Sequence, residues 1–253
     1  MKKSTPTRSL LRIAARCGVI YVVVCSAMFG LQRSLLYFPS HDAPEGRLSA
    51  WSEAGLVVGY CREVTNPDTV WLMMHGNAGQ ASDRDYVLDR LPASDALYVL
   101  EYPGYGARPG KPSRSSFDDA ALQAYNVLAK KYPDTRLCVI GESIGSGPAS
   151  YLATAPRRPD KLVLIVPFDA LHRVASRRFF ILPVSLLLLD RWDNVDALRS
   201  YSGPIDIFGA RDDDIIPCDH AKNLAGQCQR ARFHEIPGGH NDWSLSTQVK
   251  IEY

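Results

Sequence analysis

The sequence predicts an α/β fold in which a mostly parallel sheet carries helices on both faces. Short apolar runs of strand character alternate along the chain with longer runs of helical periodicity, which is the pattern of parallel strands joined by crossover helices. The length of 253 residues suits one large domain of this architecture. Apolar residues at 46% and charged residues at 22% are typical of a folded globular chain, and they exclude a disordered, collagen-like or multi-span membrane protein.

The first element is an apolar segment near the N-terminus. Cys17–Leu31 contains no charged residue, and five basic residues precede it. We expect a basic cytoplasmic N-terminus (1–12), a membrane-spanning signal anchor (13–31) and a folded domain (32–253). A span needs about 20 residues, so a cleaved signal peptide and a buried helix are the alternatives. The basic flank favours a domain outside the cytoplasm, which in a bacterium is the periplasm.

Beyond this segment the predicted helices and strands alternate in order. Ser116 and Asp119 resemble a capping box, and the helix that they begin is expected to end near Tyr132–Pro133. A run of small residues favours a second helix that ends near Ala155. Residues 168–203 interrupt the alternation, and we expect them to form a small cap insertion above the sheet. The strands are predicted at Leu56–Val64, Thr69–Met74, Ala96–Glu101, Arg136–Ile140, Lys161–Pro167, Pro204–Phe208 and Arg232–Ile236.

Charge and cysteine content exclude several kinds of partner. The net charge is +2, but the first 41 residues hold six basic residues and no acidic one, so 23 basic and 27 acidic residues remain for the domain. That balance provides no basic surface for nucleic acid. The six cysteines form no C-x-x-C pair, and on a helix Cys218 and Cys228 would lie ~15 Å apart, too far for a disulfide. We expect no nucleic acid partner, no metal, and buried, unpaired cysteines.

The motif with the clearest chemistry is G-x-S-x-G at Gly141–Gly145. It directly follows an apolar strand and opens a helix of small residues, and a sharp strand–turn–helix connection exposes the central serine. The two glycines are needed because a Cβ would meet the neighbouring strand and helix. Ser143 is therefore predicted to be a nucleophile, and the alternative is a glycine-rich turn with an incidental serine.

A serine nucleophile needs a base and an acid, and both follow in the chain. His240 lies in a glycine loop after the last predicted strand, where an imidazole can reach over the edge of the sheet. His220 and His234 lack this setting and are expected to be structural. The acid should lie in the loop after the penultimate strand, where the three residues Asp212–Asp214 are candidates for one role.

The loop His75–Gly79 supplies the last part of such a site. It follows a predicted strand and can aim the backbone N–H of Asn77 at a substrate carbonyl, beside the N–H of Ile144. These two amides are the predicted oxyanion hole. His75 has no second ligand at a helical or turn spacing, so no metal site is expected there.

These motifs resemble those of the α/β-hydrolase superfamily, and more closely its branch of membrane-anchored serine hydrolases with one N-terminal hydrophobic segment. The resemblance implies an α/β-hydrolase fold with an eight-stranded, mostly parallel sheet, no cofactor, and hydrolysis of esters or thioesters. Some members of the branch act on acylated proteins or lysophospholipids. The resemblance covers about Leu31 to Asp242 and rests on Gln32–Pro39 (QRSLLYFP), Met74–Gly79 (MHGNAG), Tyr102–Arg108 (YPGYGAR), Gly141–Gly145 (GESIG), Asp213–Pro217 (DDIIP) and Gly239–Asp242 (GHND).

The resemblance leaves two features open. The acid of the family lies four residues before the proline of D-x-[VI]-[VI]-P, which gives Asp213, whereas counting three residues on from Gly209 gives Asp212. The sequence has one extra residue between Gly209 and Pro217, so the choice between Asp212 and Asp213 as the acid stays open. The chain also stops eleven residues after Asp242, which leaves little for the family's last helix and puts the docking of this segment in question.

We therefore expect a serine hydrolase that cleaves esters or thioesters through an acyl-enzyme on Ser143, with His240 as base and Asp213 as acid. The expected partners are a small-molecule or lipid-linked acyl substrate and the membrane, and the expected state is a monomer. A peptidase of the same fold and an inactive, membrane-anchored binding protein are the alternatives. The apolar run Phe179–Leu189 is expected either to be buried within the cap or to line an acyl pocket that opens toward the bilayer.

Overall fold

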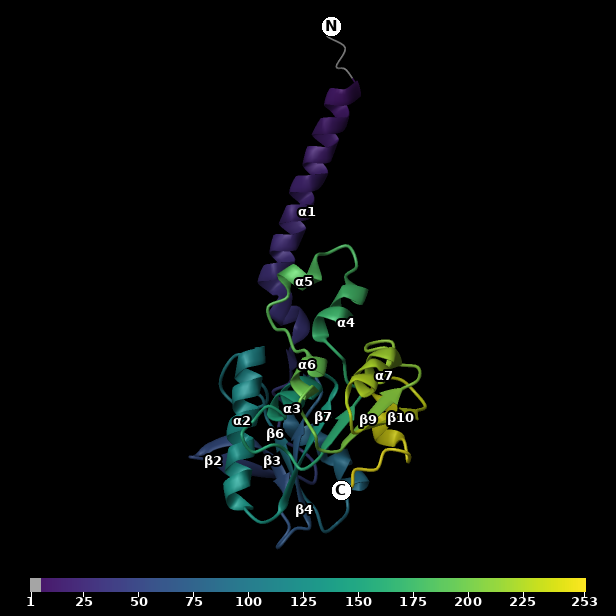
Figure 1. Ribbon diagram of the computed structural model, residues 1–253. Helices are drawn as coiled ribbons and strands as arrows, with labels where there is room; N and C mark the ends of the chain where they lie inside the picture. The colour runs from purple at the N-terminus through teal and green to yellow at the C-terminus, as the bar shows by residue number, and fades with distance from the viewer. Residues whose placement is uncertain (1–5) are drawn as a thin grey trace.

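The structure is a computed structural model that describes residues 6–253 (Figure 1). Eight strands form its main sheet, in the spatial order β10-β9-β8-β7-β4-β6-β3-β2. The six from β10 to β6 run parallel, and β3 is antiparallel to both of its neighbours. The predicted eight-stranded, mostly parallel sheet is therefore confirmed. The strands are β2 (Ser49–Glu53), β3 (Leu56–Arg62), β4 (Thr69–Met74), β6 (Ala96–Leu100), β7 (Arg136–Glu142), β8 (Leu162–Ile165), β9 (Ile205–Ala210) and β10 (Ala231–Ile236).

Helices cover both faces of this sheet, so its central strands are buried on both sides. Along β4, Val70 and Leu72 contact the core under one face while Trp71 and Met73 contact the core under the other. This two-sided burial explains why the strand is an unbroken apolar run. The helices of the first face are α2 (Arg114–Lys131), α3 (Ser146–Leu152) and α7 (Cys218–Gln227), and the second face is covered by the 3₁₀ helices η1 (Ala81–Arg90) and η3 (Asp242–Leu245).

Two parts of the predicted element order need correction. The edge strand β2 was not predicted, because the run Ser49–Glu53 is half polar and only one of its five residues is buried. The helix α2 also begins before the predicted capping box. Ser113 is its N-cap and accepts a hydrogen bond from the amide of Ser116, whose hydroxyl in turn accepts one from the amide of Ser113. Ser116 is thus the third helical residue rather than the cap.

The C-terminal segment docks on the sheet without a long helix. Trp243, Val249 and Ile251 are buried in the core under the second face. The amide of Ile251 donates a hydrogen bond to the carbonyl of Arg90 (3.0 Å). These contacts hold the segment after β10 against the second face of the sheet.

The six cysteines are all unpaired in the structure. Cys61 and Cys138 are buried, whereas Cys218 and Cys228 are only partly buried. Cys17 is exposed on the N-terminal helix, so the expected burial holds for two positions of the domain and not for its other two.

The helix α1 (Pro6–Leu36) projects from the domain like a stalk (Figure 1). Within Leu10–Leu36, an 18-residue stretch has a mean hydropathy of 1.9 and contains no buried residue, so by length and composition this part of the helix could cross a membrane. The helix continues past Leu31, the predicted end of the span, and reaches the domain without a flexible tether. Lys2 and Lys3 of the predicted basic flank lie outside the described residues.

Residues 168–203, hereafter the cap, stand beside the base of α1 and above the sheet (Figure 1). They contain three short helices, α4 (Leu171–Arg178), α5 (Val184–Leu187) and α6 (Asn194–Leu198). Polar contacts tie the cap to α1. The side chain of Gln32 donates to the carbonyl of Leu187 (3.1 Å) and accepts from the amide of Leu189 (2.7 Å).

Candidate active site

The residues predicted to form the site follow four different strands and meet at one edge of the sheet. Asn77 follows β4, Ser143 follows β7, Asp213 follows β9 and His240 follows β10. Because these strands are parallel, their carboxyl ends lie along the same edge, which is where ligands bind in folds of this kind. The cap lies above this edge (Figure 1).

The backbone around Ser143 has the strained geometry expected of a nucleophile elbow. Ser143 has φ +52°, a left-handed conformation that is uncommon for a residue with a side chain. A Cβ on Gly145 would lie 2.2 Å from the carbonyl oxygen of Met74, and one on Gly141 would lie 2.6 Å from the Cβ of Ala149. Both glycines therefore permit the close approach of strand, turn and helix that was predicted.

His240 lies between Ser143 and Asp213 and contacts both. Its Nε2 is 2.8 Å from the hydroxyl of Ser143, and its Nδ1 is 2.7 Å from the carboxylate of Asp213. An ionised carboxylate only accepts hydrogen bonds, so Nδ1 carries the proton and Nε2 is left to accept one from the serine hydroxyl. The three side chains form one continuous hydrogen-bonded chain.

The structure separates the competing aspartates. Asp213 is buried, and its second carboxylate oxygen accepts the amides of Ile215 (2.9 Å) and Ile216 (2.7 Å). Asp212 is exposed and makes no contact with His240. The family spacing counted back from Pro217, which predicts Asp213, therefore identifies the residue that contacts His240. The spacing counted on from Gly209, which predicts Asp212, does not.

Asn77 and Ile144, the predicted oxyanion-hole residues, both line the cavity that contains Ser143 and His240. The side chain of Asn77 is held on three sides. Its amide nitrogen donates to the carbonyl of Leu36, and its oxygen accepts from the amide of Phe38 (3.3 Å) and the hydroxyl of Tyr105 (2.9 Å). The loop after β4 is thus joined directly to the end of α1.

The cavity around these residues, hereafter the triad cavity, has a volume of about 530 Å³. Its wall toward the cap is apolar and includes Phe168, Leu171 and Val174. Arg84 is the only lysine or arginine in its lining. The cavity is therefore amphipathic, with a long apolar wall and one cation.

The structure adds Glu142, which the sequence analysis did not single out. Glu142 is the residue before Ser143, and its buried carboxylate accepts the amide of Gly76 (2.8 Å) and the indole N–H of Trp243 (3.0 Å). Burial alone opposes its ionisation, but Arg84 and these donors hold the pKa of Glu142 below its ordinary value. The carboxylate joins the elbow to the loop that carries Asn77. Its position inside the G-x-S-x-G motif gives no signal of this role.

His220 and His234 lie outside the candidate site and contact other acidic side chains. His220 contacts the buried carboxylate of Asp169 (2.7 Å), and His234 contacts Asp206 (3.0 Å). His75 is fully buried beside Gly76. Within residues 6–253 no cluster of histidine, cysteine and acidic side chains has the arrangement of a metal site.

Solved structures establish the class of the fold. An esterase of Pyrococcus furiosus matches 83% of this chain and 94% of its own with a TM-score of 0.60 at 14% sequence identity. Acyl-protein thioesterase 2 of Zea mays matches 72% of this chain and 91% of its own with a TM-score of 0.51 at 16% identity. At such identities the likeness concerns the fold, which is that of the α/β hydrolases.

Sequence relatives carry the assignment further. A protein of Mycobacterium tuberculosis without an assigned function is 29% identical over 93% of this chain and 89% of its own. Lysophosphatidylserine lipase ABHD12 of Xenopus tropicalis is 27% identical over 76% of this chain, and human α/β hydrolase domain-containing protein 17B is 29% identical over 70%. The matched regions span 54% and 62% of the latter two proteins. No family model matches the chain. The chain has the α/β-hydrolase fold and is similar to the α/β-hydrolase-domain-containing proteins.

Proposed function

We propose that this hydrolase cleaves carboxylic esters or thioesters through an acyl-enzyme on Ser143. The observation that carries the proposal is the continuous chain from the Ser143 hydroxyl through His240 to Asp213, with contacts of 2.8 and 2.7 Å. This is the arrangement in which a serine, a base and an orienting acid act as one unit. No part of the reaction calls for a cofactor.

In the proposed reaction, the Ser143 oxygen attacks the substrate carbonyl while Nε2 of His240 takes its proton. The carbonyl oxygen becomes negatively charged and is stabilised by the amides of Asn77 and Ile144. The imidazolium gives its proton to the leaving alcohol or thiol, and the acyl group stays on Ser143. A water molecule, deprotonated by His240, then attacks the acyl-enzyme, releases the acid and restores the serine. Asp213 stabilises the imidazolium in both halves.

The membrane is the proposed location. The composition of α1 supports an anchor, and its contacts support one that is retained. Arg33 lies 3.0 Å from Asp190, whose side chain is only 5% exposed, so cleavage after Arg33 would leave a buried carboxylate without its cation. Two similar proteins, a lysophosphatidylserine lipase and an acyl-protein thioesterase, favour a lipid-linked acyl substrate.

Labelling with a fluorophosphonate, which reacts with activated serines, tests the proposal. The full-length protein should be labelled and should hydrolyse 4-nitrophenyl butyrate. Ser143→Ala should abolish labelling and lower kcat by about 10⁴-fold or more. Ser185→Ala, at an exposed serine of α5, is the matched control and should leave both unchanged.

The alternatives give different results. An inactive binding protein would show no labelling of the full-length chain. A peptidase would cleave peptide 4-nitroanilides with a kcat/KM comparable to that for the ester. Residual activity of Ser143→Ala within tenfold of the parent would overturn the assignment of the nucleophile.

A further inference from the structure

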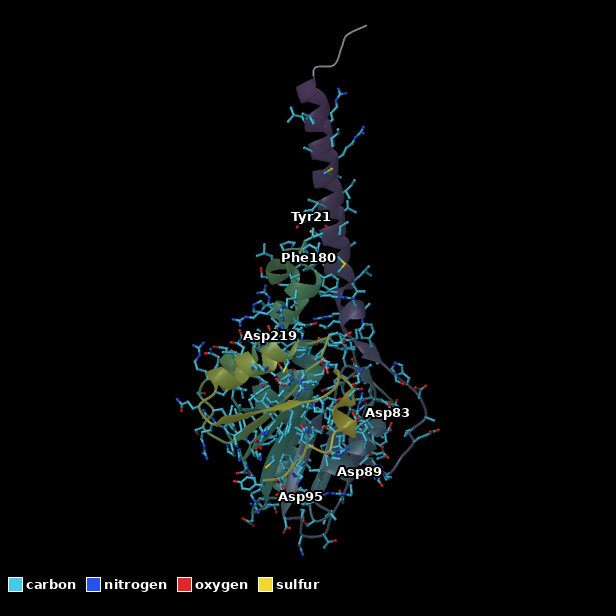
Figure 2. The ribbon with its side chains drawn as sticks, turned by 90° about the vertical axis from the view of Figure 1, so that its right-hand side faces the viewer. Tyr21, Asp83, Asp89, Asp95, Phe180 and Asp219 are labelled. Carbon is cyan, nitrogen blue, oxygen red and sulfur yellow. The ribbon has the colours of Figure 1, made fainter. Side chains whose placement is uncertain are left out.

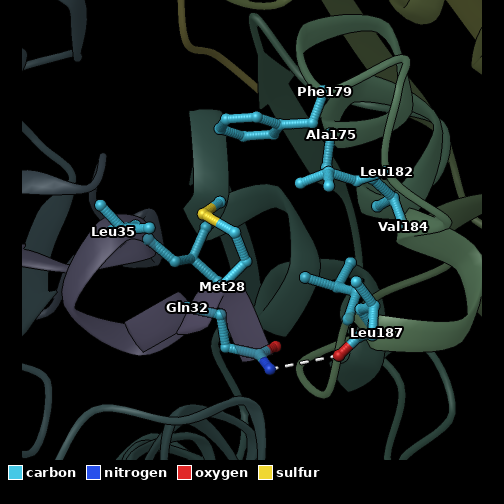
Figure 3. A pocket seen from close by; sticks show the side chains of 10 residues that line it. Met28, Gln32, Leu35, Ala175, Phe179, Leu182, Val184 and Leu187 are labelled. Carbon is cyan, nitrogen blue, oxygen red and sulfur yellow. Dashed lines mark hydrogen bonds between the residues drawn. The ribbon is translucent and has the colours of Figure 1, made fainter. Parts of the chain in front are cut away.

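A narrow apolar groove separates α1 from the cap (Figure 3). Met28 and Leu35 of α1 form one wall, and Phe179 and Leu187 of the cap face them. Gln32 is the one polar residue of the lining, and both ends of its amide are already bonded to the cap backbone. The groove therefore offers an occupant apolar contact and no free polar partner within the described residues.

The groove borders the triad cavity. Leu36, the last residue of α1, lines both spaces. The adjacent residues Val174 and Ala175 of α4 line the triad cavity and the groove respectively. The groove between α1 and the cap and the cavity around Ser143 are therefore neighbours, with Leu36 as a common wall.

The groove lies at a depth where α1 would be surrounded by lipid. The hydroxyl of Tyr21 donates to the carbonyl of Ile181 (2.9 Å), so the tip of the cap reaches twelve residues, or about 18 Å, back along α1 from Arg33. That stretch of α1 carries no charge. Figure 2 shows Tyr21 and Phe180 together at this level, well away from the sheet.

The tip of the cap has the surface of an element immersed in lipid. Phe180 and Leu186 are each 81% exposed and Ile181 is 68% exposed. Soluble surfaces rarely gather large apolar side chains in this way. Arg177 and Arg178 precede the tip and are exposed, a placement that suits contact with lipid head groups.

We propose that the groove between α1 and the cap receives the acyl chain of a membrane-resident substrate, so that the anchor helix forms one wall of the substrate-binding site. The inference rests on the proposed function of Ser143. An acyl chain is the occupant because the groove is apolar, opens where α1 meets lipid and borders the cavity that contains the proposed nucleophile. Substrate would then reach Ser143 from within the bilayer.

Filling the groove tests the proposal. Met28→Trp, in the full-length protein in mixed micelles, should lower the ratio of kcat/KM for 4-nitrophenyl palmitate to that for 4-nitrophenyl butyrate by about tenfold, because the long chain loses its site. Met28→Leu keeps the volume and the apolar surface and should keep the ratio. Val23→Trp is the control on α1, since Val23 is 60% exposed and lines none of the cavities described here.

Each other outcome has a definite meaning. The assignment of the groove as the acyl-chain site would be overturned if Met28→Trp left the ratio of the two kcat/KM values unchanged or lowered both values equally. The proposed function would remain in place. An equal fall of this ratio in Val23→Trp would also overturn the assignment, because the change would then result from any bulky substitution on α1. If the full-length protein hydrolysed neither ester, both the proposed function and the proposed acyl-chain site would be contradicted.

Discussion

Asp212 and Asp213 are adjacent in the chain but differ in their surroundings. Asp213 is buried, with one carboxylate oxygen on His240 and the other on two backbone amides, whereas Asp212 is exposed. Only a residue whose carboxylate meets Nδ1 can select the tautomer in which Nε2 accepts a proton. The two positions therefore provide a matched pair for testing which carboxylate serves the reaction.

Asp213→Asn should lower kcat for 4-nitrophenyl butyrate by about 10⁴-fold, because an amide in this position favours the wrong tautomer of His240. Asp212→Asn should remain within about twofold of the parent. Steady-state kinetics of the two variants, with circular dichroism to verify folding, measures the difference. Exchanged phenotypes would make Asp212 the acid.

Sequence patterns could identify the residues whose chemistry depends on local spacing. Ser143 follows from the two glycines that its turn needs, and His240 from its place after the last strand. Glu142 could not be found in this way, because its partners Gly76, Arg84 and Trp243 come from two parts of the chain that are distant from it in sequence. A buried carboxylate is recognised by what surrounds it, and one sequence does not contain that information.

Asp118 is another buried carboxylate, and its effect on stability should depend on pH. It lies on α2, accepts the indole N–H of Trp192 (2.8 Å), and is paired with Arg114. Burial outweighs these partners and raises the pKa of Asp118 to about 6. An unfolded aspartate has a pKa of about 3.9, so between these values the folded state binds more protons. The stability contributed by this group is therefore lost as the pH rises from about 4 to about 6.

Asp118→Asn should remove this dependence. Relative to the parent, the variant's free energy of unfolding should rise between pH 4 and pH 7 by about 2 to 3 kcal/mol. Thermal unfolding of both proteins in detergent across this range measures the difference. Asp119→Asn, at the exposed neighbour on the same helix, is the control. A difference that stays flat with pH would contradict the raised pKa.

At the level of elements, one carboxylate joins three parts of the fold. Asp190 follows α5, contacts Arg33 of α1 through both oxygens (3.0 and 3.3 Å) and accepts the first amide of α2, from Arg114 (3.0 Å). An acidic group at a helix N-terminus also interacts favourably with the helix dipole. The position of the cap over the triad cavity therefore depends on this residue.

Asp190→Ala should loosen the cap without unfolding the sheet. Loss of these charge-assisted bonds should cost about 1 to 2 kcal/mol locally, which raises the population of the open cap about 5- to 30-fold. Trypsin cleavage after the exposed residue Arg191 should accelerate by the same factor. Asp196→Ala, which removes an exposed pair with Arg199, should have no such effect. Equal cleavage rates in the two variants would mean that Asp190 does not hold the cap.

Elements were predictable where burial imposes a pattern. The central strands are buried on both faces, and their apolar runs lie within a few residues of the observed bounds. The edge strand β2 pairs with only one neighbour and has little burial, so its sequence resembles a loop. The start of α2 was misplaced because Ser113, Ser115 and Ser116 are chemically equivalent caps until the hydrogen bonds are known.

At the scale of the whole molecule, the charges around α1 favour one orientation across a membrane. Five basic residues precede Cys17, whereas Arg33 is the only one that directly follows the apolar segment, and it is paired with Asp190. Positively charged flanks stay in the cytoplasm. The domain should therefore lie on the opposite side, together with the triad cavity.

Alkaline phosphatase fused after Tyr253 should be active in intact bacterial cells and should fractionate with the membrane, because the reporter needs the disulfides that form only outside the cytoplasm. The same fusion beginning at Tyr37 lacks α1 and should be inactive. An inactive full-length fusion at normal expression would place the domain in the cytoplasm. Active reporter in the soluble periplasmic fraction would mean that α1 is a cleaved signal.

The direct bond between the end of α1 and Asn77 has a kinetic consequence. With no flexible linker, an anchored protein keeps Ser143 at a fixed height above the bilayer. Its remaining motions are lateral diffusion and rotation about the membrane normal. Its search for substrate is then two-dimensional. The quantity that sets the encounter rate is the number of substrate molecules per unit area of lipid, so adding inert lipid at constant total substrate dilutes the substrate and slows the enzyme.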